Sequence, residues 1–247
     1  MTDASLRIER FADRVVATLD RPAVRNAIDQ ALIDALHALC TELEEDPRIL
    51  ILTGAGGIFA SGADIAQLRA RRAEDALAGI NTHAFRRIRR LPMPVIAAID
   101  GYALGGGAEL AYAADLRLGT PRTRIGNPET GLGILAAAGA TWRLPQIVGE
   151  ARATELLLTG RVLDAQDALA WGMLGSVHEP EELLPAAHAL ADRIAQNDPL
   201  ATRATKTALL APADRHPEIE LELQAELFES PEKHRRMTAF LERRKNR

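Results

Sequence analysis

Apolar residues at the start of the chain alternate between short runs and helical spacing. The runs Leu6 to Glu9 and Arg14 to Leu19 predict two strands, joined by a turn at Ala12-Asp13. A helix with Asp29 near its start is predicted next, because apolar side chains recur every three or four residues: Leu32, Ile33, Leu36, Leu39, Cys40 and Leu43. The run Ile49 to Leu52 then predicts a buried strand.

The middle of the chain continues this alternation. Short apolar runs predict strands at 94–99, 115–119 and 175–177. Helical patterns predict helices at 66–90, 108–114, 136–148, 151–158 and 165–171, the last capped by Asp164. A chain that alternates strands with helices in this way belongs to the α/β class.

The final third of the chain contains only helical patterns. Amphipathic helices are predicted at 181–196, 199–210 and 217–228, and a last helix begins near Glu232. We therefore expect two parts. Residues 1–190 form an α/β core, and residues 191–247 form a C-terminal helical region.

Three consecutive glycines stand between a predicted strand and a predicted helix at residues 99–110. Gly105, Gly106 and Gly107 indicate a sharp bend or the close approach of another group. A helix N-terminus presents free N–H groups, and Glu109 follows Gly106 by three residues, on the same side of the helix. One turn can thus offer an N–H to an oxyanion and a carboxylate to move a proton. An ordinary strand-to-helix turn with a first-turn acid explains the pattern equally well.

A second glycine-rich stretch, residues 53–65, also follows a predicted strand and precedes a predicted helix. Asp64 is expected to cap the following turn through backbone N–H groups. The centre, Ile58-Phe59-Ala60, is apolar, which a solvated surface loop does not need. We interpret this stretch as a second source of backbone donors.

Glu129 is a candidate acid in an apolar setting. It follows Pro128, which fixes the local backbone, and it precedes the largely apolar stretch 130–135. A carboxyl group among apolar residues has a raised pKa and can serve as a general acid. A solvent-facing turn acid is the alternative interpretation.

Composition limits the possible classes of protein. The 247 residues carry a net charge of −4 and are 47% hydrophobic, which fits a globular protein and gives no argument for nucleic acid. The single cysteine, Cys40, cannot form an internal disulfide and is expected to be a buried thiol. No apolar run approaches the roughly 18 residues of a membrane span, and residues 1–10 lack a secretory core. We expect a soluble, cytoplasmic protein.

Several familiar site types are absent from the sequence. The glycines at 105–107 match neither the dinucleotide-binding fingerprint nor the P-loop, and no Gly-x-Ser-x-Gly occurs. The six histidines are scattered without a metal-ligand spacing, so we propose no metal site. The arginine-rich segment 66–90 also carries acids, as a solvated helical face does.

Five blocks of residues occur in order along the chain: Leu19-Asp20-Arg21-Pro22 with Arg25-Asn26-Ala27; Phe59 to Ile65; Asp100 to Leu110; Pro128-Glu129 with Gly131 and Gly133; and Leu158-Thr159-Gly160 with Ala165 to Ala168. Together they resemble the enoyl-CoA hydratase/isomerase (crotonase) superfamily over essentially the whole chain. Each block alone is a weak signal. The set is highly specific for the superfamily and less specific for the reaction.

The resemblance implies a spiral of repeated strand-strand-helix units, and a C-terminal helical region that builds homotrimers, often paired into hexamers. It also implies that two backbone N–H groups bind the thioester oxygen of an acyl-CoA. The matching positions here are Ala63 and Gly106. Loss of one such donor costs roughly 3–4 kcal/mol of transition-state stabilisation.

The hydratases of the superfamily use two glutamates, which match Glu109 and Glu129 here. The resemblance therefore implies addition of water to a 2-enoyl-CoA, giving a 3-hydroxyacyl-CoA, with coenzyme A as part of the substrate and no separate cofactor. We hypothesise that Glu129 exchanges a proton with the α carbon and that Glu109 holds and activates the water. Because two nearby carboxylates do not both ionise cheaply, one should be protonated near neutral pH.

Other matching positions imply contacts with coenzyme A: Arg25, Ala27, Ala60, Asp64, Ile65, Phe240 and Arg243. Hydratases of the superfamily often have lysine at the position of Arg243, and a basic helix end explains this tail equally well. Ala137 replaces a glycine of the typical hydratase beside the catalytic water. Alanine lacks glycine's access to positive φ and adds a methyl group, which puts efficient hydration in question.

Two rival functions stay open at this level. An isomerase or another acyl-CoA lyase on the same scaffold would need Glu129 and not Glu109. A coenzyme A-binding or RNA-associated partner with little catalysis has the arginine-rich segment 66–90 as its only support, and the net charge of −4 argues against it. Acyl chain length is also open, since residues 66–90 are expected to line the acyl pocket.

Overall fold

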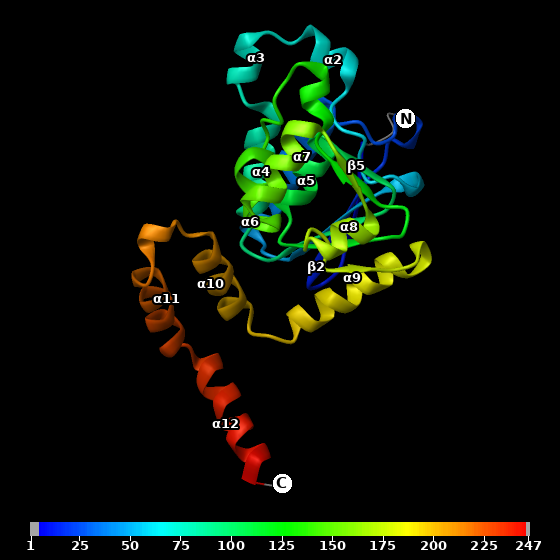
Figure 1. Cartoon of the computed structure of the whole chain (residues 1–247). Helices are drawn as coiled ribbons and strands as arrows, with labels where there is room; N and C mark the ends of the chain where they lie inside the picture. The colour runs from blue at the N-terminus through cyan, green and yellow to red at the C-terminus, as the bar shows by residue number, and fades with distance from the viewer. Residues whose placement is uncertain (1–4, 246–247) are drawn as a thin grey trace. The chain divides into compact units, whose positions relative to one another are not determined.

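Figure 1 shows the computed structural model of the chain, which describes residues 5–245. The chain divides into two compact units, the first ending at Ala191 and the second beginning at Asp192. The first unit alternates strands and helices, and the second is helical. The α/β class with a helical C-terminal region is therefore confirmed.

A six-stranded sheet runs through the first unit. Its spatial order is β1-β2-β3-β4-β6-β9, in which β1 pairs antiparallel with β2 and the other neighbours pair in parallel. Its strands are β1 (Leu6–Arg10), β2 (Arg14–Leu19), β3 (Ile49–Gly54), β4 (Val95–Ile99), β6 (Leu116–Gly119) and β9 (Ser176–Val177). Every one of them contains or lies within a predicted strand, because apolar runs in buried parallel strands are visible in sequence.

A second sheet, of three strands, contains the residues that lead into α5 and was not predicted. It has the order β5-β7-β8, made of β5 (Tyr102–Leu104), β7 (Arg124–Gly126) and β8 (Val162–Asp164). Strand β5 pairs in parallel with β7, and β7 pairs antiparallel with β8. Each of the three strands has only one or two buried residues and so shows no continuous apolar run, and the sequence patterns did not predict them.

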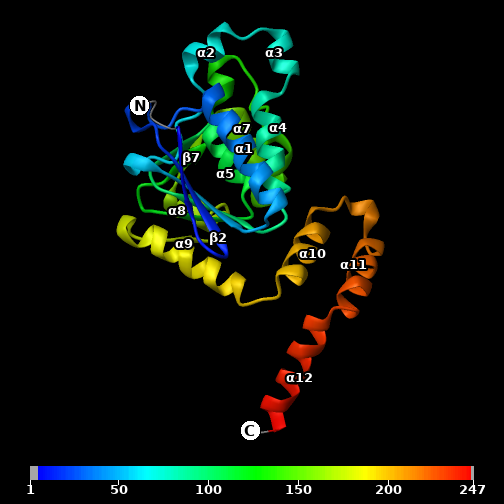
Figure 2. The ribbon, with the colours of Figure 1, turned by 180° about the vertical axis from the view of Figure 1, so that it is seen from behind.

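One face of the large sheet packs on helices α1, α4 and α5, which Figures 1 and 2 show grouped together. Helix α1 (Gln30–Glu45) is capped by Asp29 and buries all six apolar side chains of the predicted stripe. Helix α4 spans Ile80–Arg89, and α5 spans Gly106–Ala113. Every residue of α5 is buried, so this helix crosses the middle of the core and fixes whatever its first turn carries.

Helix α9 (Pro180–Ala195) covers the opposite face of the large sheet. Side chains alternate across a strand, so Arg14 and Val16 of β2 point away from the face that packs on α1. Arg14 Nη1 donates to the carbonyl oxygen of His188 on α9 over 2.8 Å. Leu183 and Ala187 of α9 are buried on this side.

The remaining helices of the first unit are short: α2 (Ile65–Ala70), α3 (Ala73–Leu77), α6 (Ala140–Val148), α7 (Glu150–Thr159) and α8 (Ala165–Ala170), with one-turn helices at Pro22–Val24, Ala55–Gly57 and Pro128–Leu132. Asp64 caps α2 and Asp164 caps α8, as predicted. The second unit contains α10 (Pro199–Leu210), a turn at Ala213–Arg215, α11 (Glu218–Phe228) and α12 (Pro231–Lys245). Within residues 5–245 none of the helices combines the length and hydropathy needed to cross a bilayer.

Two helix predictions were wrong in detail. Segment 66–90 is three helices, α2, α3 and α4, because the chain is extended at Arg71 and Arg72 and left-handed at Gly79. Helix α6 begins at Ala140 and not at Ala136. Residues 136–139 instead form a non-helical segment, here called the strap. The backbone amide of Ala138 within it donates a hydrogen bond to Glu109.

Candidate active site

Gly105, directly before α5, has a backbone conformation that any other residue would adopt only with strain. Gly105 has φ 52° and ψ −123°, which turns the chain from β5 into the helix. The amide of Gly106 is therefore the first of the helix and has no partner within it. No acceptor among residues 5–245 satisfies the Gly106 amide, so it is free to bind a ligand.

The second glycine-rich loop runs beside this turn. Ala60 pairs with β5 on both sides, since its amide donates to Tyr102 O at 2.9 Å and its carbonyl accepts from Leu104 N at 3.0 Å. A Cβ on Gly106 would stand 3.7 Å from the amide nitrogen of Ala63. The Ala63 amide also has no acceptor within the described part of the chain. The two amides named from sequence are thus brought together.

Close packing between the two stretches depends on Gly107. A Cβ there would lie 2.2 Å from the carbonyl oxygen of Ala60, a distance that real Cβ atoms essentially never show. The same crowding occurs at Gly62, whose φ is 105° and whose Cβ would lie 2.9 Å from Leu104 O. The glycines therefore permit the close approach that the sequence analysis expected.

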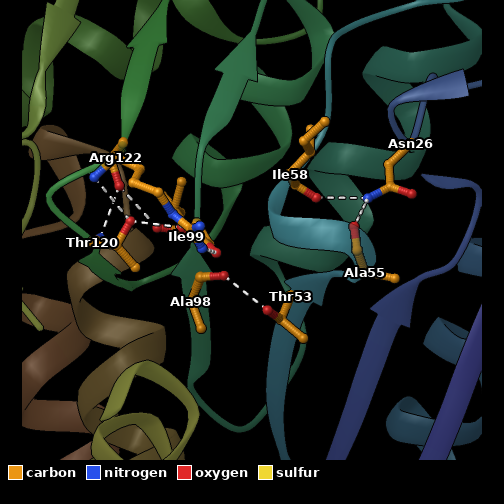
Figure 3. Close-up of polar contacts among 10 residues, drawn as sticks. Asn26, Thr53, Ala55, Ile58, Ala98, Ile99, Thr120 and Arg122 are labelled. Atoms are coloured by element: carbon orange, nitrogen blue, oxygen red, sulfur yellow. Dashed lines mark hydrogen bonds and ion pairs between the residues drawn. The ribbon is translucent and has the colours of Figure 1, made fainter. Parts of the chain in front are cut away.

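Asn26 holds the base of the loop (Figure 3). Its fully buried amide donates to the carbonyl oxygens of Ala55 at 3.0 Å and Ile58 at 2.6 Å. Thr53 donates to the carbonyl oxygen of Ala98 and so joins β3 to β4 just before the loop. These contacts fix the loop that carries Ala63 relative to the strand that leads to Gly106.

Glu109 is buried in α5, with 4% of its surface exposed. Its Oε1 accepts hydrogen bonds from the amides of Ala138, at 2.7 Å, and Ala140, at 3.1 Å. Burial is the main cause that raises its pKa from the ordinary 4.5 to about 7; the charge of Glu129 acts in the same direction, and the backbone hydrogen bonds oppose both. The carboxyl group is therefore poised for proton transfer near neutral pH.

Glu129 is the second buried carboxyl group, with 9% of its surface exposed. Burial raises its pKa above the ordinary value, against the hydrogen bonds from its own backbone and from Asn127. This is the direction predicted from its apolar neighbours. Its Oε2 has no hydrogen-bond partner among residues 5–245, so one oxygen remains open to a ligand or water.

A pair of residues that the sequence analysis missed orients Glu129. Asn127 Nδ2 donates to Glu129 Oε1 over 3.3 Å, and the hydroxyl of Tyr112 donates to Asn127 Oδ1 over 3.1 Å. Tyr112 is fully buried on α5, three residues after Glu109. The sequence held one signal for it, a tyrosine inside a segment otherwise made of alanine, leucine and glutamate.

The carboxylate of Glu129 also lies against the turn that carries the free amide. A Cβ on Gly105 would stand 3.0 Å from Glu129 Oε1. Glu109 lines a small cavity together with Phe85, Ala138, Gly139 and Trp142. The volume open to the centre of a water-sized sphere in this cavity is about 10 Å³, which gives room for about one water molecule. The two free amides and Glu129 thus lie at the first turn of α5, and Glu109 on the same helix lines the space for a water.

The positions matched to coenzyme A are distributed around this centre. Arg25 is exposed and left-handed, with φ 54°, and its carbonyl accepts from Ser61 N at 3.0 Å, which joins the 25–27 turn to the loop. Ala27 and Ala60 are buried. The carboxylate of Asp64 accepts from the amides of Ala66 and Gln67, and Ile65 is exposed.

Phe240 and Arg243 do not belong to this centre within the first unit. Both lie on α12 of the second unit, where Phe240 is exposed and Arg243 Nε donates to the carbonyl oxygen of Ala239. Their contact with coenzyme A stays a prediction.

Ala137 has an ordinary backbone conformation. Outside glycine, only Arg25 and Asn26 of the described residues have positive φ. Ala137 is exposed, and its carbonyl accepts from the hydroxyl of Thr82 at 3.1 Å. The effect of its methyl group on the placement of the water stays a prediction.

A search of residues 5–245 for three or more histidine, cysteine, aspartate or glutamate side chains placed to hold a metal ion finds none. The buried charges of the site are carboxyl groups held by backbone amides and by Asn127. The arrangement is therefore suited to moving protons beside a polarised oxygen.

Known proteins resemble this chain closely. A family model described as Enoyl-CoA hydratase/isomerase matches residues 12–247. A crotonyl-CoA hydratase of Syntrophomonas wolfei is 36% identical over 99% of this chain and 98% of its own length. A short-chain-enoyl-CoA hydratase of Clostridium acetobutylicum is 36% identical over 96% of this chain and 95% of its own. The crystal structure of an enoyl-CoA hydratase from Bacillus anthracis superposes with a TM-score of 0.91 at 32% identity, covering 97% of this chain and 96% of that one.

These likenesses extend over essentially the whole chain, and the structural neighbours are enoyl-CoA hydratases of the crotonase fold. The chain therefore belongs to the enoyl-CoA hydratase/isomerase family and is an enzyme of that family.

Proposed function

We propose that the protein is an enoyl-CoA hydratase that adds water to a short-chain 2-enoyl-CoA and yields a 3-hydroxyacyl-CoA. The observation that carries this proposal is the pair of buried, mutually repelling carboxyl groups, Glu109 and Glu129, beside the free amides of Ala63 and Gly106. The names of the relatives, a crotonyl-CoA hydratase and a short-chain-enoyl-CoA hydratase, support the substrate class.

The two amides bind the thioester oxygen of the substrate. When water attacks the β carbon, negative charge gathers on that oxygen, and donors fixed beforehand stabilise it without reorganising. The glycines at 62 and 107 allow the two stretches of backbone to lie this close. The two amides thus lower the energy of an enolate-like transition state.

The two glutamates move the protons. Water gives its oxygen to the β carbon and one proton to a carboxylate, and the α carbon takes a proton from a carboxyl group. We assign the water to Glu109, which lines the small cavity, and the α-carbon proton to Glu129, whose Oε2 is open. The pair holds one proton near neutral pH, so Glu109 takes a proton from the water as Glu129 gives one to the α carbon, and a proton then returns from Glu109 to Glu129 for the next turnover.

The reaction needs no cofactor in this proposal, because coenzyme A enters as part of the substrate and the protein supplies all the proton-transfer groups. The 25–27 turn and the 60–65 loop are the proposed coenzyme A contacts of the first unit, completed by Phe240 and Arg243 of a neighbouring subunit in a homotrimer or a pair of trimers. We place the enzyme in the cytoplasm, in the β-oxidation of fatty acids.

An isomerase that shifts a double bond between positions 3 and 2 is the second candidate. It would require Glu129 as the proton carrier and would tolerate loss of Glu109. The hydrogen bonds from Ala138 and Ala140 favour the hydratase, because they hold Glu109 in a fixed orientation that a dispensable side chain does not need.

The test is the ultraviolet absorbance of crotonyl-CoA after addition of the protein. Hydration removes the conjugated enoyl band, and Glu109→Gln and Glu129→Gln should each slow this loss by about 10²–10⁴-fold. Glu155→Gln is the matched control, since Glu155 is an exposed glutamate paired with Arg161. A native protein that binds acyl-CoA but leaves the band unchanged would refute the proposal for short chains, and a Glu109→Gln variant that still converts 3-enoyl-CoA would favour the isomerase.

A further inference from the structure

A polar side chain that no part of the proposed mechanism uses stands beside the two free amides. Asn81 lies in the first turn of α4. Its Nδ2 is 3.5 Å from the position that a Cβ on Gly106 would occupy, and the Ala63 amide nitrogen is 3.7 Å from the same position. Two donors from distant parts of the chain therefore converge on one point next to the third, the Gly106 amide.

The other end of the same side chain is unsatisfied. Asn81 Oδ1 is buried and has no hydrogen-bond partner among residues 5–245. A buried polar atom without a partner costs free energy, and native proteins keep few of them. Because Oδ1 is an acceptor, only a water or a donor of a bound molecule satisfies it, so an oxygen of the substrate is bound by Nδ2 and not by Oδ1.

The helix that carries Asn81 is firmly anchored. Ala84, Phe85 and Ile88 bury its inner face in the core. Thr82, the next residue, donates to the carbonyl oxygen of Ala137 in the strap that holds Glu109. The buried face of α4 and the hydrogen bond of Thr82 thus hold the part of the helix that carries Asn81.

We infer that Asn81 is a third donor to the thioester oxygen of the substrate, acting with the amides of Ala63 and Gly106. The inference rests on the proposed hydratase function for its reaction and on the geometry around Gly106 for its site. An oxygen bound near the convergence point accepts from two backbone amides and from Asn81 Nδ2. Such a donor adds to charge stabilisation in the transition state, so it acts mainly on kcat.

The experiment compares the native protein with Asn81→Leu, an apolar side chain of similar size, and Asn81→Ala, which removes the bulk as well. The probe is a chromophoric cinnamoyl-CoA, whose absorption moves to longer wavelength when donors polarise its thioester carbonyl. We expect both variants to lose part of this shift and to hydrate crotonyl-CoA 10–100-fold more slowly, with KM changed less than threefold. Binding of coenzyme A alone, which lacks the thioester oxygen, should not change.

Asn197→Leu is the control, because Asn197 is an exposed asparagine outside the first unit. An unchanged shift and a kcat within twofold of the native value in both Asn81 variants would overturn the inference, as would an equal loss of coenzyme A binding. The proposed function fails separately. A native protein that shifts the cinnamoyl-CoA band without hydrating crotonyl-CoA, and variants that lose the shift, would refute the hydratase and retain Asn81 as a donor.

Discussion

Asn127 Nδ2 lies 3.3 Å from Glu129 Oε1 and is the side-chain donor that the structure gives this buried carboxyl group. The orientation of the Asn127 amide depends in turn on the hydroxyl of Tyr112, which donates to its Oδ1 over 3.1 Å. All three side chains are buried. Tyr112 is therefore a positioning residue that acts on the chemistry through Asn127.

Tyr112→Phe should destabilise the protein and change its pH dependence. Without the hydroxyl, Asn127 Oδ1 is unpaired, which costs about 1–2 kcal/mol in the free energy of unfolding. The amide is then free to turn its oxygen toward Glu129. Because the hydrogen bond from Asn127 lowers the pKa of Glu129, its loss should raise that pKa and move the acid limb of the kcat profile to higher pH. Urea unfolding and kcat at several pH values measure both effects.

Tyr102→Phe serves as the matched control, since Tyr102 is the other tyrosine of the chain and is 47% exposed. It should leave both stability and the pH profile unchanged. An acid limb at the native position in Tyr112→Phe, with lower stability alone, would reduce Tyr112 to a structural role.

The rate of hydration should fall on the alkaline side of neutrality. The carboxyl pair carries one proton in the active form, and the pKa of Glu109 is about 7. Above this value the last proton leaves, so kcat/KM for crotonyl-CoA should decline about tenfold for each further pH unit. Initial rates between pH 5 and pH 9 test this, and a profile that stays flat to pH 9 would contradict it.

Stability should also decline as pH rises, owing to Glu109. Its pKa in the folded protein, about 7, is above the 4.5 of an unfolded chain, so the folded state holds its proton more tightly. The resulting stabilisation is complete below pH 4.5 and is lost as pH rises through 7. Its full size is about 3 kcal/mol, at 1.36 kcal/mol for each unit of pKa.

Glu109→Gln removes this titration while keeping an oxygen to accept from Ala138 and Ala140. Urea unfolding of both proteins at pH 5 and pH 8.5 should show the variant gaining on the native protein as pH rises. Equal losses in the two proteins would mean that Glu109 ionises at no cost to the fold.

Gly107→Ala should disrupt the approach of the two glycine-rich stretches. Its new methyl group would meet the carbonyl of Ala60 at 2.2 Å, a clash with backbone that no side-chain rotation relieves. We expect a loss of about 3 kcal/mol in unfolding free energy and, because Ala63 moves with its loop, a lower kcat. Gly131→Ala, where nothing lies within 4 Å, should change stability by less than about 0.5 kcal/mol. Thermal unfolding of the native protein and of the two variants measures both changes in stability. Equal stability of the two variants would contradict the prediction.

Much of this fold could be predicted from sequence because its signals are local. The stripe of α1, its cap at Asp29 and the caps at Asp64 and Asp164 each depend on residues within one or two turns of one another. The central strands β2, β3 and β4 of the large sheet were visible because buried strands are continuous apolar runs. The strands of the second sheet have one or two buried residues each and no such run, so that sheet escaped prediction.

For the candidate site too, some features could be predicted from the sequence and others could not. The sequence by itself determined which groups were available: its glycine runs and its two acids were candidates, and the resemblance to the superfamily selected Ala63, Gly106, Glu109 and Glu129 from them. Which of them meet, and in what protonation state, depends on distance and burial. These follow from packing between segments far apart in the chain.

Tertiary structure alone decided the polar partners of the site. Tyr112 reaches Asn127, fifteen residues away, only because α5 packs on β5 and β5 pairs with β7, which ends directly before Asn127; Asn81 comes beside Gly106 only because α4 packs on α5. The same packing buries Glu109 and raises its pKa to about 7. Hydrophobic periodicity records which face of an element is buried but not what it is buried against, and the chemistry of this site depends on the latter.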